Sequence, residues 1–279
     1  MKRGMLLLSC CLLLSGCGNY GQLQPMEEPE WKIQEEAVVT FSDGETVDCW
    51  VETYSWGTAW GYYYYKLSDG TELLREEQDN GPENVYVMNH ESWQDLGETA
   101  REAVSAYYEE QGLLYDVEEE LEKAYGDYLA CRESGTEFQS WLVGQSVSPM
   151  ASNEELFSFL TVVTLPQGGG IVDELRLGTI FDRETGAVVS PWDLFSVSEE
   201  EAREAILDQV SKWEPELRQE MAAAMKLEYL LWQDDHLELW FPAGSLPGEA
   251  YAWGTGIDYA ELKDVLHDWA VPAPYVGKA

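Results

Sequence analysis

Residues 156–165, LFSFLTVVTL, are the stretch of sequence that decides the fold. Successive side chains of a strand point to opposite faces of its sheet, and both faces of this strand would be apolar. The stretch therefore predicts a central strand. Three glycines, residues 168–170, end it in a turn. A half-buried strand is predicted next, because apolar and polar residues alternate at Leu175, Leu177, Thr179 and Phe181.

The N-terminal part of the chain predicts two hairpins. Residues 37–41 and 47–54 flank a short turn that contains Gly44. Residues 60–67 are followed by Asp69-Gly70 and then by Leu73 and Leu74, which predicts the second hairpin. Short strands are also expected at residues 85–88, 229–232, 237–241 and 254–257.

Aromatic side chains are concentrated between Tyr54 and Tyr65, where Trp and Tyr occupy most positions. Two interpretations are open. The rings could form a platform that stacks on sugars, or they could alternate between the core and the surface of a strand.

Apolar residues three or four positions apart predict helices in several other segments. Ser198 and Glu201 have the spacing of a capping box at the start of one of them, and Asp258 is expected to cap the last. Trp213 and Trp269 are expected on the inner sides of these two helices. The predicted helices cover about residues 93–107, 117–131, 198–213, 215–225 and 258–269.

The N-terminus has the pattern of a bacterial lipoprotein signal peptide. Lys2 and Arg3 precede an apolar run, which ends in Leu14-Ser15-Gly16-Cys17. We expect residues 1–16 to be removed and Cys17 to carry the lipid that anchors the protein at the outer face of the cell membrane. An ordinary secretory signal is the alternative. Residues 17–34, rich in Gly, Pro and polar residues, are expected to be a tether.

The chain is strongly acidic, with 53 Asp and Glu against 16 Lys and Arg and a formal net charge of -37. Nucleic acid is excluded as a partner, because neutralising phosphates needs clustered basic residues. A cationic partner would be attracted. The same charge could instead serve only solubility.

Two cysteines, Cys49 and Cys131, lie beyond the signal region. Outside the cytoplasm they could form a disulfide. Both also fall on predicted apolar faces, Cys49 in a strand and Cys131 in a helix, where they could pack as buried thiols.

Motifs for enzyme chemistry are absent from the sequence. It has only three histidines, and it has no His-Glu-x-x-His, Gly-x-Ser-x-Gly or Asp-x-Asp-x-Asp-Gly motif. We therefore expect no enzyme activity, no cofactor and no metal. A pair of Asp or Glu residues acting on cell-wall glycan is the alternative.

A series of short segments resembles the extracytoplasmic domain of the RsiV anti-sigma factor family, which also occurs beside the deacetylase domain of PdaC and in free-standing lipoproteins. The segments include residues 153–159, 168–170, 181–186 and 191–195. The resemblance implies an α+β fold, an antiparallel β-sheet with helices packed on one face. In this chain we expect the RsiV-like domain at residues 81–270. An N-terminal β-rich region, residues 35–80, would precede it, and residues 271–279 would form a C-terminal tail. The motif residues, expected to be structural, are Phe181, Asp182, Thr185, Gly186, Asp193, Leu194 and Phe195.

The resemblance also implies a function, since this domain binds lysozyme in the anti-sigma factors. We expect neither a cytoplasmic sigma-binding domain nor a deacetylase domain, and Ile171 stands where the family often has a histidine. We therefore expect a non-enzymatic, lipid-anchored binding protein for a cell-envelope component or a cationic protein such as lysozyme. A glycan hydrolase and an accessory scaffold for a membrane partner are the alternatives. The ligand-binding residues are not predicted.

Overall fold

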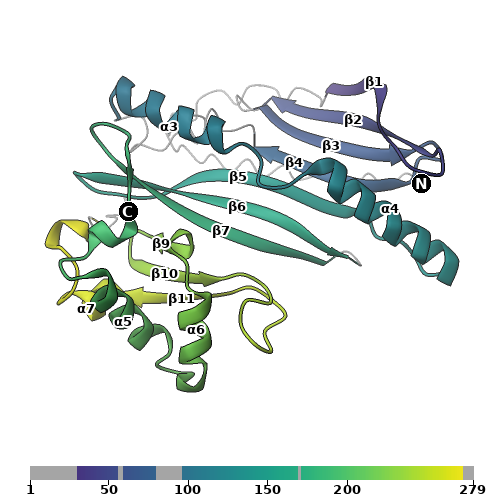
Figure 1. Cartoon of the computed structure of the whole chain (residues 1–279). Coiled ribbons are helices and arrows are strands. Elements are labelled where there is room, and N and C mark those ends of the chain that lie inside the picture. The colour runs from purple at the N-terminus through teal and green to yellow at the C-terminus, as the bar shows by residue number, and fades with distance from the viewer. Residues whose placement is uncertain (1–29, 56–58, 80–95, 169–170, 273–279) are drawn as a thin grey trace, which may run out of the picture.

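The computed structural model describes residues 30–55, 59–79, 96–168 and 171–272. The chain forms an eight-stranded sheet with two long helices on one side and a smaller layer on the other (Figure 1). This confirms the expected α+β class. The signal region with Cys17, the predicted strand at 85–88 and Trp93 lie outside the described residues.

The large sheet has the strand order β1-β2-β3-β4-β5-β6-β7-β8. Neighbouring strands are antiparallel except β4 and β5, which run parallel. Parallel neighbours need a long crossover, and the segment between β4 and β5 contains both long helices. The strands are β1 (Glu30–Thr40), β2 (Thr46–Ser55), β3 (Ala59–Leu67), β4 (Glu72–Asp79), β5 (Trp141–Ser152), β6 (Leu156–Gly168), β7 (Ile171–Asp182) and β8 (Val188–Val189).

The N-terminal hairpins are part of this same sheet. Their turns contain Gly44 and Gly70, whose φ angles of 91° and 88° favour glycine. The parallel pairing of β4 with β5 then continues the sheet into its C-terminal half. Residues 30–34, predicted to be tether, belong to β1 instead, since they pair with β2.

The central strand β6 is buried on both faces, as its sequence predicts. Phe157 and Phe159 pack with Val104 and Tyr108 of helix α3 (Glu98–Gln111). Leu156, on the opposite face, packs in a separate cluster with the smaller layer. The hydroxyl of Ser158, on that same face, donates to the Trp232 carbonyl at 2.9 Å.

Helix α4 (Val117–Ser134) covers the N-terminal half of the sheet on the α3 side (Figure 1). Leu121 and Ala124 are fully buried against the sheet. The Tyr125 ring stacks on Phe41 at a centroid distance of 3.9 Å, and so fixes the helix over the first hairpin.

The smaller layer contains a second sheet, in the order β11-β10-β9, which the sequence did not predict as a separate sheet. Its core includes Trp232, Leu237 and Leu239, each fully buried. The layer comprises β9 (Leu230–Trp232), β10 (His236–Phe241), β11 (Trp253–Asp258), α5 (Glu199–Val210), α6 (Arg218–Ala224) and α7 (Tyr259–Leu262), with short 3-10 turns η1 (Pro191–Leu194), η2 (Pro215–Leu217), η3 (Leu227–Tyr229) and η4 (Asp268–Ala270).

Two tryptophans expected on buried helix faces are exposed. Trp213 is 86% exposed, because α5 ends at Val210 and Trp213 no longer follows the helical spacing of its buried residues. Trp269 is 42% exposed, because α7 ends at Leu262, much earlier than predicted. Leu266 instead pairs as an isolated bridge with Phe195.

Cys49 and Cys131 are both free thiols, so the structure does not contain the disulfide considered from the sequence. Cys49 is 1% exposed and packs in the core beneath α4. Cys131 is only half-buried near the C-terminal end of α4 and is not part of that core, contrary to its predicted position on the buried stripe.

Candidate binding site

The RsiV-like motif residues 181–186 form the end of β7 and the turn after it. The Asp182 Oδ1 atom accepts hydrogen bonds from the backbone N–H and the hydroxyl of Thr185, at 2.7 and 2.6 Å. These bonds hold the pKa of Asp182 below its usual value. Gly186 has φ 72° and lies against α3, where an added Cβ would be 2.5 Å from the Ala100 carbonyl oxygen. Phe181 is fully buried beside α3.

The second motif segment holds the C-terminal part of the chain in place. Leu194 is fully buried, and its carbonyl accepts from the His267 N–H at 2.9 Å. Phe195 is buried and bridges to Leu266, whereas Asp193 is exposed in the first turn of η1. Leu194 and Phe195 therefore hold residues 266 and 267 in place.

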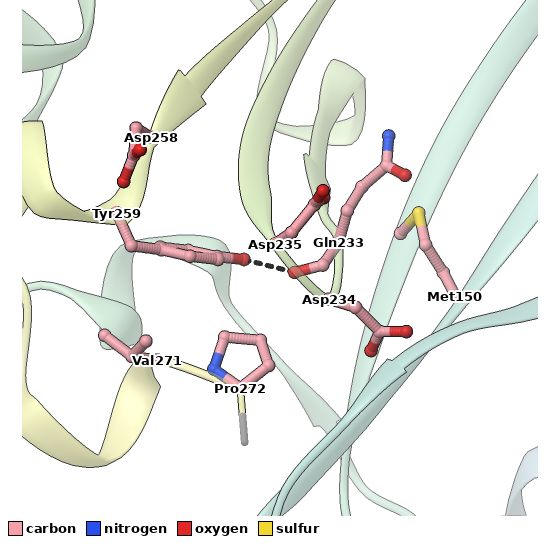
Figure 2. Close-up of a pocket in the computed structure, with 8 residues that line it drawn as sticks. All are labelled: Met150, Gln233, Asp234, Asp235, Asp258, Tyr259, Val271 and Pro272. Atoms are coloured by element: carbon pink, nitrogen blue, oxygen red, sulfur yellow. Dashed lines mark hydrogen bonds between the residues drawn. The ribbon is translucent and has the colours of Figure 1, made fainter. Parts of the chain in front are cut away.

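A pocket of about 780 Å³ lies where that C-terminal segment meets the smaller sheet (Figure 2). The β9–β10 turn provides Gln233, Asp234 and Asp235, and Asp258 and Tyr259 follow at the end of β11. Met150 of β5, Val271 and Pro272 complete the lining.

Hydrogen bonds fix the walls of this pocket. The Tyr259 hydroxyl donates to the Gln233 carbonyl at 2.5 Å, so the aromatic ring is held against the β9–β10 turn (Figure 2). The Trp232 indole N–H donates to the Ala270 carbonyl at 2.8 Å, which anchors the segment that carries Val271. Asp258 accepts from the Ala260 N–H at 2.8 Å and so caps α7, as the sequence predicted.

The pocket is acidic. Three of its eight lining residues are aspartates, and none is Lys, Arg or His. Asp235 is exposed and contacts His236 Nδ1 at 2.5 Å, a hydrogen bond that lowers the pKa of this aspartate. Burial, and then the charges of Asp234 and Asp235, raise the pKa of Tyr259. The arrangement is therefore suited to a cationic group held by carboxylates beside an aromatic ring.

At residues 62–65, strand β3 follows the second interpretation given above, because its rings alternate between the two faces of the sheet. The side chains of residues 53–61, which include the other aromatic residues of this segment, lie outside the described part of the structure. Tyr65 is buried in the core beneath α4, and Tyr63 packs against the same core. Tyr62 and Tyr64 lie on the other face, where their hydroxyls donate to Glu77 and Glu52 at 3.2 and 2.8 Å.

Comparisons with known proteins give a likeness of fold only. No family model matches the chain, and no curated protein matches it. Two similar solved structures are DUF3298 family proteins. The one from Pseudomonas aeruginosa PAO1 is 14% identical, with a TM-score of 0.37, covering 90% of this chain and 98% of the other. The one from Bacteroides fragilis NCTC 9343 is 11% identical, with a TM-score of 0.43, covering 86% and 94%.

At these identities and TM-scores, the likeness assigns neither a family nor a function to this chain. Within the described residues, no helix has the length and apolar character needed to cross a bilayer. No group of three or more His, Cys, Asp or Glu residues in the same part of the chain is placed to hold a metal ion.

Sequence reasoning did not find the pocket. Asp258 was expected only as a helix cap, and Asp234 and Asp235 lie between two predicted strands, at residues 229–232 and 237–241. Their common position depends on the pairing of β10 with β11, which sets His236 opposite Asp258.

Proposed function

We propose that the protein is a non-enzymatic, lipid-anchored binding protein at the outer face of the cell membrane. Its ligand is a cationic group, carried by a cell-envelope component or by a basic protein such as lysozyme. The acidic pocket formed by Asp234, Asp235 and Asp258 carries this proposal. The lipobox ending at Cys17 supports the location.

The lowered pKa of Asp235 supports the binding of a cation at the pocket. A glycosidase needs one carboxylic acid whose pKa is raised so that it can donate a proton. Among the described residues, each carboxyl with a clear pKa shift is shifted downward, including Asp235 in the pocket. The lowered pKa keeps Asp235 ionised, which suits the attraction of a cation.

Removing the charge of the pocket tests the binding site. The triple variant Asp234→Asn, Asp235→Asn and Asp258→Asn keeps side-chain size and the cap of α7. We expect it to bind a lysozyme and an arginine-rich peptide about tenfold more weakly, which corresponds to about 1.4 kcal/mol.

A matched control removes three charges elsewhere. Glu133, Glu137 and Glu249 are exposed, and no ion pair of theirs is found among the described residues. Their replacement by Gln should leave affinity within about twofold, because only non-specific attraction falls. Equal losses in the two triple variants would show that the overall charge, and not the pocket, attracts the ligand.

The lipid anchor has its own test. Mass spectrometry of the N-terminal peptide from membranes should find a lipid-modified Cys17, and Cys17→Ala should release the protein from the membrane. An unmodified N-terminus produced by ordinary signal cleavage would refute the anchor without affecting the pocket.

A further inference from the structure

The linker between α3 and α4 presents two exposed leucines. Leu113 is 45% exposed and Leu114 is 37% exposed, whereas the next residue, Tyr115, is half-buried. This linker lies on the helix side of the large sheet, whereas the acidic pocket lies in the layer on the other side (Figure 1).

The backbone around these leucines is fixed on both sides. Gln145 of β5 accepts from the Leu114 N–H at 2.8 Å and donates to the Gly112 carbonyl at 2.9 Å. Tyr115 donates to the buried carboxylate of Glu76 at 2.8 Å. Binding of a partner over the two leucines would therefore lose little conformational entropy, because the loop is already ordered.

Carboxylates flank the two leucines on both sides in the sequence. Glu109 and Glu110 are exposed at the end of α3, and Glu118 is exposed at the start of α4. None of the three makes an ion pair with another described residue. The nearby Lys123 of α4 is already paired with Glu119 and Glu120, at 2.9 and 2.7 Å.

We propose that this leucine tip, residues 112–116, docks into an open cleft of a basic protein. Leu113 and Leu114 enter the cleft, and the flanking glutamates meet lysines or arginines at its rim. The negative charge of these glutamates indicates a positively charged partner, because interfaces pair opposite charges. The proposal rests on the proposed function only for the positive charge of the partner, since it makes no use of the pocket.

Binding of the purified protein to basic probes tests the tip. The probes are a lysozyme and ribonuclease A, which are basic and have open clefts, and polylysine, which has charge but no cleft. The variant Leu113→Ser with Leu114→Ser should bind at least one cleft-bearing protein tenfold or more weakly at physiological salt. Its binding to polylysine should be unchanged.

Val188→Ser provides the matched control, because Val188 is 55% exposed and lies on β8, outside the tip. It should bind like the wild type. Three results would overturn the proposal: leucine variants within twofold of the wild type, equal losses for polylysine, or no binding of any cleft-bearing probe at physiological salt.

The pocket variants separate this inference from the proposed function. If the aspartate triple variant loses binding and the leucine variant keeps it, the pocket is supported as the binding site and the leucine tip is refuted. If the leucine variant loses binding and the aspartate triple variant keeps it, the tip is supported as the binding surface and the pocket is refuted as the binding site.

Discussion

Tyr65 on β3 donates a hydrogen bond of 2.6 Å to Glu76 on the neighbouring strand β4, and Glu76 is only 1% exposed. The carboxylate also accepts from Tyr115 in the α3–α4 linker at 2.8 Å. A buried charge is costly unless hydrogen bonds replace its hydration. The two phenols therefore couple the linker to the sheet through one acidic residue.

Replacing Tyr65 by Phe should destabilise the protein by about 1.5–3 kcal/mol, because a buried carboxylate loses a donor. Urea denaturation measures the loss. Tyr62→Phe is the control, since its longer bond to Glu77, 3.2 Å, is only partly buried and should contribute about 0.5–1.5 kcal/mol. A similar small loss in both variants would contradict a special role for the buried pair.

Alkaline pH should destabilise the fold through the same tyrosines. Burial, and then the charge of Glu76, raise the pKa of both Tyr65 and Tyr115. Since the folded pKa exceeds the unfolded value of about 10, the stabilisation is complete below pH ~10 and is lost as pH rises above it. Phenolate absorbance against pH should show these tyrosines ionising only as the protein unfolds. Their ionisation in the folded state near pH ~10 would refute this.

Cys49 should resist alkylation in the native protein. Burial raises the pKa of its thiol to about 11, so little thiolate exists at neutral pH. Peptide mass spectrometry after iodoacetamide should find Cys131 labelled in the native state and Cys49 labelled only in urea. A disulfide-linked peptide containing both residues would contradict the free thiols of the structure.

Gly186→Ala should cost about 2–4 kcal/mol, because it combines positive-φ strain with a backbone clash against Ala100. Gly70→Ala is the matched control. Its φ is 88°, but an added Cβ meets nothing within 4 Å, so about 1–2 kcal/mol is expected. Equal urea midpoints for the two variants would show that contact with α3 does not require a glycine.

The two tryptophans Trp213 and Trp232 should differ sharply in their contribution to stability. Trp213→Ala should change the free energy of unfolding by less than about 0.5 kcal/mol, since the side chain is 86% exposed. Trp232→Ala should cost about 3–5 kcal/mol, because the ring is fully buried. A large loss for Trp213 in thermal denaturation would show that its exposed position is wrong.

Local patterns in the sequence predicted many of the individual elements. The apolar faces of residues 156–165 identified the central strand, and Ser198 with Glu201 identified the start of α5. Such features depend on side-chain alternation and on hydrogen bonds between residues a few positions apart. The sequence therefore determined many of the strands, the two N-terminal hairpin turns and most helix starts.

Tertiary structure alone decided how these elements meet. Whether the N-terminal hairpins join the main sheet depends on the parallel pairing of β4 with β5, which no local pattern specifies. Trp213 was predicted to be buried and is exposed. The spacing of apolar residues did not show that α5 ends at Val210, before Trp213. Asp234 and Asp258 share a pocket because antiparallel pairing of β10 with β11 returns the chain to the same end of the smaller sheet.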